Sequence, residues 1–153
     1  MDILEKSELI HSLIIRRNKY KGGKTNNQKY QKRVKKEFYQ NICNTLYTLC
    51  IRGTGNFSTR FFETLALGRI PVFVNTDCIL PFENEINWKE HIVWVEKNDL
   101  TEIGEKISDF HNGLDKDDFI QLQIKNRLLW EKYFSFPGFI NKLVHHLNKK
   151  LKS

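Results

Sequence analysis

The chain has 153 residues, of which 40% are hydrophobic and 12% aromatic, so it is long enough for one domain with a core and too apolar for a disordered protein. Its net charge of +7 is uneven, because Met1–Gln40 carries 11 Lys and Arg against 4 Asp and Glu, whereas residues 41–153 carry 14 of each. The basic charge therefore belongs to an N-terminal arm. Residues 41–153 have no net charge, whereas a nucleic-acid-binding domain usually has an excess of Lys and Arg.

The N-terminal part divides into a basic arm and linker, residues 1–28, and the start of a domain over residues 29–153. Within the arm, the apolar spacing of Leu4–Ile15 predicts a short amphipathic helix. Arg16–Gln28 combines glycines, asparagines and like charges, and this composition is typical of a loop or linker. Lys29–Asn44 has apolar residues every fourth position and a lysine-rich opposite side, which predicts a helix.

The rest of the chain alternates short apolar runs with helical patterns. Ser58 is a good N-cap and Gly68 a good C-terminal residue for a helix between two of these runs. The segment Ile70–Val74 is β-branched or apolar at nearly every position, as in a strand that is buried on both faces. The predicted strands are Tyr47–Ile51, Ile70–Val74 and His91–Val95, and the later helices are Thr101–Asn112, Asp115–Phe134 and Pro137–Leu151.

This alternation predicts an α/β fold with right-handed crossovers and a parallel sheet flanked by helices. Three strands are few for a doubly wound sheet, whose common orders use five or six. The sequence therefore predicts a partial Rossmann-like domain, and one sheet edge is expected to be exposed unless the arm or a partner covers it.

The most informative segment is the loop between the first two strands and the helix that follows it. Gly53 and Gly55 allow a close approach of phosphate to the backbone, and the start of a helix attracts anions. Arg52 and Arg60 can donate paired hydrogen bonds to phosphate oxygens. Glu63 shares a helix face with Arg60, where its carboxylate could bind ribose hydroxyls or form an ordinary i,i+3 ion pair. The segment thus predicts a nucleotide diphosphate site.

The run RGTGNFSTRFFETLALGRIPVFVNTDCILPF, Arg52–Phe82, resembles the C-terminal signature of exostosin-type glycosyltransferases. The resemblance continues through Asn87-Trp88 and Leu129–Phe134 and covers roughly residues 37–139. It implies the C-terminal half of a GT-B fold, in which two Rossmann-like domains face each other and the C-terminal one holds a nucleotide-sugar donor. It also implies transfer of the sugar, usually from a UDP-sugar, to a glycan acceptor without a cofactor or an obligatory metal.

The resemblance also assigns roles to individual residues. It places Arg52 at the pyrophosphate, Glu63 at the ribose, and Asp77 at the crevice beyond the next strand. The remaining donor-binding positions that it implies are Gly53, Thr54, Gly55, Asn56, Ser58 and Arg60. The acceptor-binding half and the first strands of the donor half have no counterpart here, so no catalytic base is assigned and a separate polypeptide is a candidate source of the missing half.

Two other interpretations remain open at the level of sequence. Gly53–Ser58 is close to the G-x-G-x-x-G fingerprint of NAD-binding modules, with Asp77 near the position of the ribose-binding acid. Against it, a helix precedes the first strand, and the two arginines have no role in that fingerprint. The chain could instead be a non-catalytic module that binds a nucleotide sugar or, through its lysine-rich arm, a polyanion. A solvated helix face and linker explain the arm equally well, and nucleic acid is not an expected partner.

The remaining signals concern compartment and core. Cys43, Cys50 and Cys78 form no C-x-x-C pair and are expected to be reduced thiols. No segment approaches the roughly 20 apolar residues of a membrane span, and acids near Met1 argue against a signal peptide. A soluble, cytoplasmic protein is expected, whereas the resemblance implies Golgi-bound eukaryotic relatives. Trp94 and Trp130 are predicted core residues, and Trp88, in the loop after Pro81, is the one tryptophan that could lie near the cleft.

Overall fold

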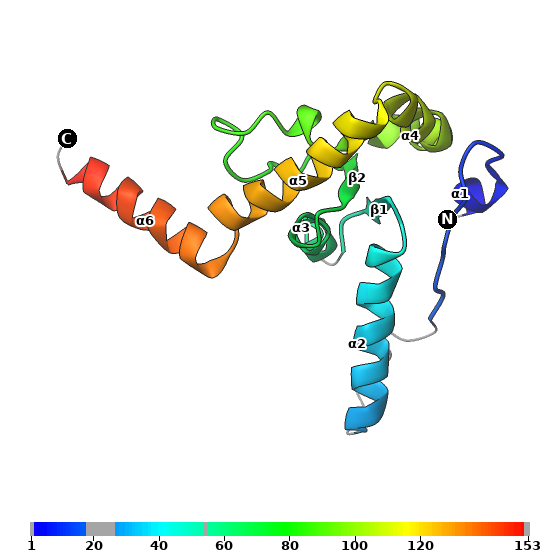
Figure 1. Cartoon of the computed structure of the whole chain (residues 1–153), viewed down its shortest axis with the longest axis horizontal. Helices are drawn as coiled ribbons and strands as arrows, with labels where there is room; N and C mark the ends of the chain where they lie inside the picture. The colour runs from blue at the N-terminus through cyan, green and yellow to red at the C-terminus, as the bar shows by residue number, and fades with distance from the viewer. Residues whose placement is uncertain (1, 18–26, 54, 152–153) are drawn as a thin grey trace.

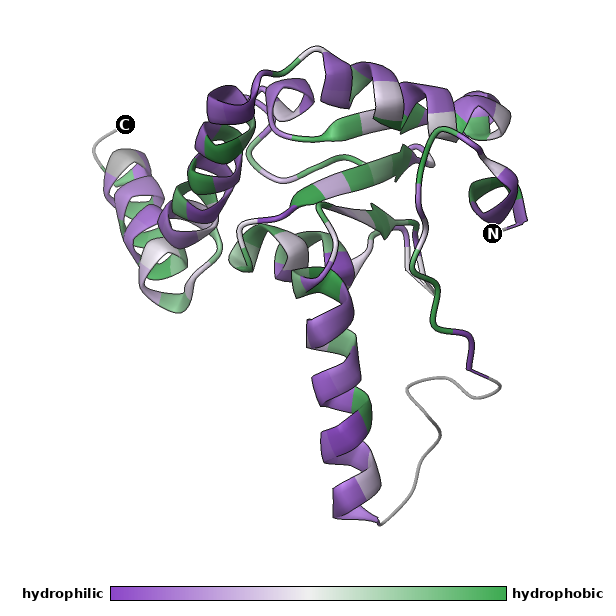
Figure 2. Ribbon diagram, turned by 45° about the vertical axis from the view of Figure 1, so that its right-hand side comes forward, coloured by the Kyte–Doolittle hydropathy of each residue, from purple (hydrophilic) through white to green (hydrophobic). Residues whose placement is uncertain are grey.

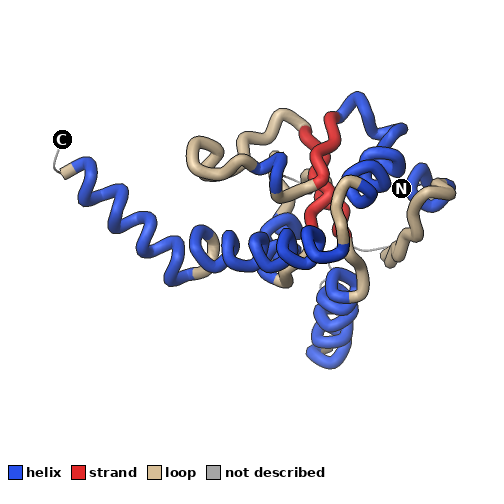
Figure 3. Tube along the Cα trace, turned by 45° about the horizontal axis from the view of Figure 1, so that its top comes forward, coloured by secondary structure: helices blue, strands red, loops and turns tan. Residues whose placement is uncertain are grey.

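The computed structural model is a parallel sheet with helices on both faces (Figures 1 and 3). It describes residues 2–17, 27–53 and 55–151. Within these ranges the sheet has three strands in the order β1-β2-β3, and both pairings are parallel. The strands are β1 (Tyr47–Cys50), β2 (Ile70–Asn75) and β3 (Val93–Glu96). The predicted α/β class, with a partial parallel sheet, is confirmed.

Most predicted helices lie where the sequence placed them, within one or two residues. Asn27 and Asp115 cap two of them, since their side chains accept hydrogen bonds from the backbone N–H of Tyr30 (3.1 Å) and Asp118 (2.8 Å). Gly68 ends another with a φ of 62°, which favours glycine. The helices are α1 (Asp2–Lys6), α2 (Gln28–Cys43), α3 (Thr59–Ala66), α4 (Ile103–Asn112), α5 (Lys116–Tyr133) and α6 (Phe136–Lys150), with 3-10 turns η2 (Trp88–Glu90) and η3 (Lys97–Glu102).

Two helix predictions need correction. The helix predicted over Leu4–Ile15 ends at Lys6, because the Ser7 hydroxyl accepts a hydrogen bond from the Leu9 N–H (3.3 Å) and competes with the helical pattern. Beyond Ser7 the chain is extended, and Ile10 packs against the core. The helix predicted from Thr101 begins at Ile103, after a 3-10 turn that includes Thr101. Residues 18–26 of the predicted linker lie outside the described residues.

The sheet has a separate apolar cluster on each face. Because successive side chains of β2 point to opposite faces, Phe73 joins one cluster and Val72 and Val74 join the other. On the first face the cluster includes Phe61 and Leu65 of α3 and Leu129 and Tyr133 of α5. On the second face it includes Ile103 and Ile107 of α4 and Leu122 of α5. Figure 2 shows the apolar strands between these helical layers, with α2 projecting away from them.

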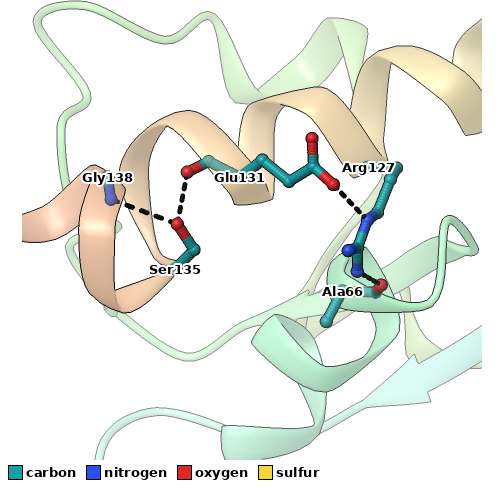
Figure 4. A network of polar contacts seen from close by, with 5 residues as sticks. All are labelled: Ala66, Arg127, Glu131, Ser135 and Gly138. Atoms are coloured by element: carbon teal, nitrogen blue, oxygen red, sulfur yellow. Dashed lines mark hydrogen bonds and ion pairs between the residues drawn. The ribbon is translucent and has the colours of Figure 1, made fainter.

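A polar network fixes the junction of α5 and α6 against the end of α3 (Figure 4). Arg127 pairs with Glu131 (2.9 Å) and donates to the carbonyl oxygen of Ala66. The Ser135 hydroxyl donates to the carbonyl of Glu131 (2.5 Å) and accepts from the N–H of Gly138 (3.1 Å). The start of α6 is thereby tied to the last turn of α5. No helix in the described part of the chain is long and apolar enough to cross a membrane.

Candidate functional site

Two loops meet at the carboxyl edge of the sheet, where open α/β sheets bind their ligands. The first, residues 51–58, follows β1 and carries the glycines, and the second, residues 76–81, follows β2. Asn56 joins them, because its amide donates to the carbonyl oxygen of Asp77 (3.0 Å) and its side-chain oxygen accepts from the Thr76 hydroxyl (3.3 Å). The structure thus brings Asn56 and Asp77, 21 residues apart in sequence, into direct contact.

A cavity of about 470 Å³ lies between these two loops. Its polar lining comes from predicted site residues, namely Asn56, Ser58 and Asp77. Asp77 has a φ of 59°, a left-handed conformation that is uncommon for a residue other than glycine. The apolar lining is Phe57, Phe61, Phe62, Phe73, Cys78, Ile79, Leu80 and Pro81. The cavity can therefore hold a ring or chain with an apolar face and a few polar groups at its mouth.

The glycine loop leads directly into α3. Ser58 occupies the N-cap position with extended backbone angles, but its side chain makes no capping hydrogen bond. A Cβ added at Gly53 would meet nothing within 4 Å, so the space beside this residue is open, while its N–H donates to the carbonyl of Phe57 (3.4 Å). A Cβ at Gly55 would lie 3.5 Å from the Phe57 ring, an ordinary contact. Thr54, the other predicted loop residue, lies outside the described residues.

The charged residues of the predicted site do not all face the same cavity. Arg52 is exposed on the loop and has no ion-pair partner among the described residues. The Arg60 guanidinium lies over the Phe38 ring of α2, 5.3 Å from its centroid, and lines a second cavity. Glu63 is half-buried on α3. The structure therefore gathers Asn56, Ser58 and Asp77 around the first cavity and turns Arg60 toward α2.

A polar cluster lies at the ends of β2 and β3; the resemblance places Asn75 at this crevice, but sequence reasoning missed Glu96. The Glu96 carboxylate accepts hydrogen bonds from the Asn75 amide (2.9 Å) and from the Trp94 indole (2.6 Å). Asn75 also accepts from the N–H of Cys78 (3.4 Å) and so orders the loop that contains Asp77. An acid directly after the apolar run HIVWV was the available signal, since the last residues of parallel strands share one edge of the sheet.

Trp88 is absent from the cavity lining but lies directly behind it. It is buried in the first core cluster, where its ring packs on Phe61 and stacks with Phe134. Its indole N–H donates to the carbonyl of Pro81 (3.0 Å), a residue of the cavity wall. Trp88 therefore supports the wall from behind. Trp94 and Trp130, the predicted core residues, are half-buried and pack against the margin of the same cluster.

The three thiols are expected to react at very different rates. Cys43 is exposed, Cys78 is partly buried with a raised pKa, and burial raises the pKa of Cys50 to about 12. At pH 8 Cys50 therefore has almost no thiolate, the reactive form. We expect iodoacetamide to modify Cys43 first, Cys78 more slowly, and Cys50 only in urea, as followed by peptide mass spectrometry. Native Cys50 reacting as fast as Cys43 would contradict the described packing.

The fold and this edge define a class: a parallel α/β half-domain with a polar, glycine-bearing loop before a helix. The exostosin GT47 domain matches residues 5–109 of the chain. Exostosin-1 of Drosophila melanogaster is 33% identical over 101 residues, which are 66% of this chain and 12% of the fly protein. Exostosin-1 of Bos taurus is 31% identical over 101 residues, 66% of this chain and 13% of the bovine protein.

A plant relative matches a shorter stretch. The probable glucuronosyltransferase GUT1 of Oryza sativa subsp. japonica is 32% identical over 66 residues, 43% of this chain and 16% of the rice protein. The chain belongs to the exostosin GT47 family of glycosyltransferases. It spans only about an eighth to a sixth of the length of these relatives. Membership in this family leaves the dehydrogenase alternative without support.

Proposed function

We propose that this chain is the donor-binding part of a glycosyltransferase and holds a nucleotide sugar, in the first instance a UDP-sugar, at the carboxyl edge of its sheet. The observation that carries the proposal is the cavity of about 470 Å³ between the glycine loop and the Asp77 loop, in a chain of this family. Its apolar wall suits a sugar or base ring, and Asn56 and Asp77 can exchange hydrogen bonds with hydroxyl groups.

The diphosphate would lie outside this cavity, between the loop and the start of α3. There Arg52, the backbone of Gly55, the Ser58 hydroxyl and the helix N-terminus can all bind phosphate oxygens. Arg60 would join them by leaving its position over Phe38, and Glu63 would bind the ribose. We also propose that these cationic and dipolar groups, rather than an obligatory metal or cofactor, stabilise the departing diphosphate.

The reaction would be displacement at the anomeric carbon of the donor sugar. The bond from this carbon to the diphosphate oxygen breaks, and a bond to a hydroxyl oxygen of a glycan acceptor forms. The hydroxyl proton passes to a base that we assign to the acceptor-binding half, which a separate polypeptide would supply. The name of the rice relative makes UDP-glucuronic acid the first donor to test.

We expect UDP and UDP-glucuronic acid to bind the chain in titration calorimetry, and Arg52→Ala to weaken UDP binding by about 10- to 100-fold. The reason is that a hydrogen bond between charged groups contributes about 1.5–3 kcal/mol. Arg33→Ala is the matched control, because it removes the same charge from the exposed side of α2. Circular dichroism should show both variants folded.

The proposal fails if the folded wild-type chain binds neither ligand, or if Arg33→Ala weakens UDP binding as much as Arg52→Ala does. Binding of a sulfated polysaccharide without any UDP binding would favour the non-catalytic polyanion module instead. The lysines on the exposed side of α2 would explain that result. They are Lys29, Lys32, Lys35 and Lys36.

A further inference from the structure

One edge of β1 has backbone groups that no strand of the described residues satisfies. The Ile70 N–H donates to the carbonyl of Leu46 (3.3 Å), so the backbone groups of Leu46 face β2. In a parallel strand the backbone groups of alternate residues point to opposite sides. Those of Tyr47 and Leu49 therefore point away from β2, toward the outer edge. An unpaired edge of this kind is a template for another strand.

A cavity of about 660 Å³ lies directly beside this edge. β1 forms one wall, and the extended segment 9–15 forms the facing wall. Phe38 of α2 and Arg60 of α3 line it from one face of the sheet, and Ile107 of α4 lines it from the other. The two helical layers that cover the sheet thus continue past β1 and cover the cavity as well. The cavity therefore lies where one more strand, next to β1, would extend the sheet.

Polar and apolar groups at this cavity both lack partners. Thr48 is 6% exposed, and its hydroxyl has no hydrogen-bond partner among the described residues. Buried hydroxyls are nearly always paired. Leu13 and Leu46, which line the cavity, remain about half exposed. An extended polypeptide would meet both needs, because its side chains and backbone reach the walls and the open edge of β1 together.

We propose that this cavity is a slot for one extended segment of a second polypeptide, which has apolar side chains on one face and small hydroxyl-bearing side chains on the other and runs parallel to β1. The parallel direction follows from the sheet, whose strands are all parallel and covered by helices on both faces. A segment in this direction leaves the slot beside the loop of residues 51–58. If the proposed function holds, the incoming polypeptide delivers its next residues to the donor site.

The test uses the full chain, labelled with nitrogen-15, and a synthetic ten-residue peptide of alternating valine and threonine with lysine at each end. At millimolar peptide we expect hydrogen exchange of the Tyr47 and Leu49 amides to slow at least tenfold. The amides of Thr48 and Cys50, which face β2, should change little. A peptide that is N-methylated at every residue has no N–H to donate along either edge and should give no protection. No donor is present, so this result is independent of UDP binding.

Two further measurements address the place and direction of the peptide. Leu13→Glu puts a charge on the facing wall and should weaken peptide binding at least tenfold, whereas Leu128→Glu, at a similarly exposed position on α5, should not. A nitroxide at the carboxyl end of the peptide should broaden the Gly53 amide, and one at the amino end should not. Unchanged exchange at Tyr47 and Leu49, equal protection by the methylated peptide, or broadening from the amino end overturns the proposal. So does protection that rises with protein concentration alone, which would make a second copy the occupant.

Discussion

Replacing Phe61 by alanine is expected to lower the free energy of unfolding by about 3–5 kcal/mol. Phe61 lies on α3 and is 1% exposed. Its ring packs at 5.1–5.7 Å, centroid to centroid, against the rings of Phe62, Phe73 and Trp88. The substitution removes the contact by which α3 holds both the sheet and the wall behind the cavity. Urea denaturation followed by far-UV circular dichroism measures the change.

Phe57 is the matched control, because it is a phenylalanine of the same cavity that is 56% exposed. Phe57→Ala should change the free energy of unfolding by no more than about 0.5 kcal/mol. Phe61→Leu, which keeps most of the volume, should lose less than Phe61→Ala. Equal losses for Phe57→Ala and Phe61→Ala would show that α3 does not pack on the sheet as described.

The sheet could be predicted because its strands are apolar on both faces and short. Within Ile70–Val74, Phe73 packs in one cluster and Val72 and Val74 in the other. The run therefore has no polar residue of the kind that an amphipathic helix or a half-exposed strand would carry. The carboxyl edge, where the first cavity lies, could be named by the same reasoning, since parallel strands end together. The contact between Asn56 and Asp77 then places two loops side by side that the sequence separates by a helix and a strand.

What escaped prediction depends on contacts between distant segments. The spacing of Arg60 and Glu63 indicates a shared helix face but says nothing of what that face meets. The Arg60 guanidinium lies over the ring of Phe38 on α2. The position of α2 depends on tertiary packing, so the spacing along α3 could not predict this contact. In the arm, the apolar spacing fits a helix, but Ile10 packs on the core from an extended segment instead. Local propensity is overridden wherever burial elsewhere contributes more.

Asn126→Ala is expected to lower the free energy of unfolding by about 2–4 kcal/mol, because it leaves several polar groups without partners. Asn126 is a fully buried residue of α5. Its amide donates to the carbonyls of His91 (2.9 Å) and Arg69 (3.4 Å), and its oxygen lies 3.0 Å from Nδ1 of His91. Asn112→Ala is the control, because the Asn112 side chain makes an exposed hydrogen bond to the Ser108 hydroxyl. This variant should change the free energy of unfolding by less than about 0.5 kcal/mol.

Asn126→Leu separates the hydrogen bonds from the packing, since leucine fills a similar volume but cannot bond the two carbonyls. It should remain destabilised, and wild-type stability in this variant would show that the network contributes nothing. Arg69 and His91 precede β2 and β3, at the amino edge of the sheet. The donor site is proposed at the carboxyl edge. The folded fraction of Asn126→Ala should therefore bind UDP with the wild-type affinity, so that stability falls while binding does not.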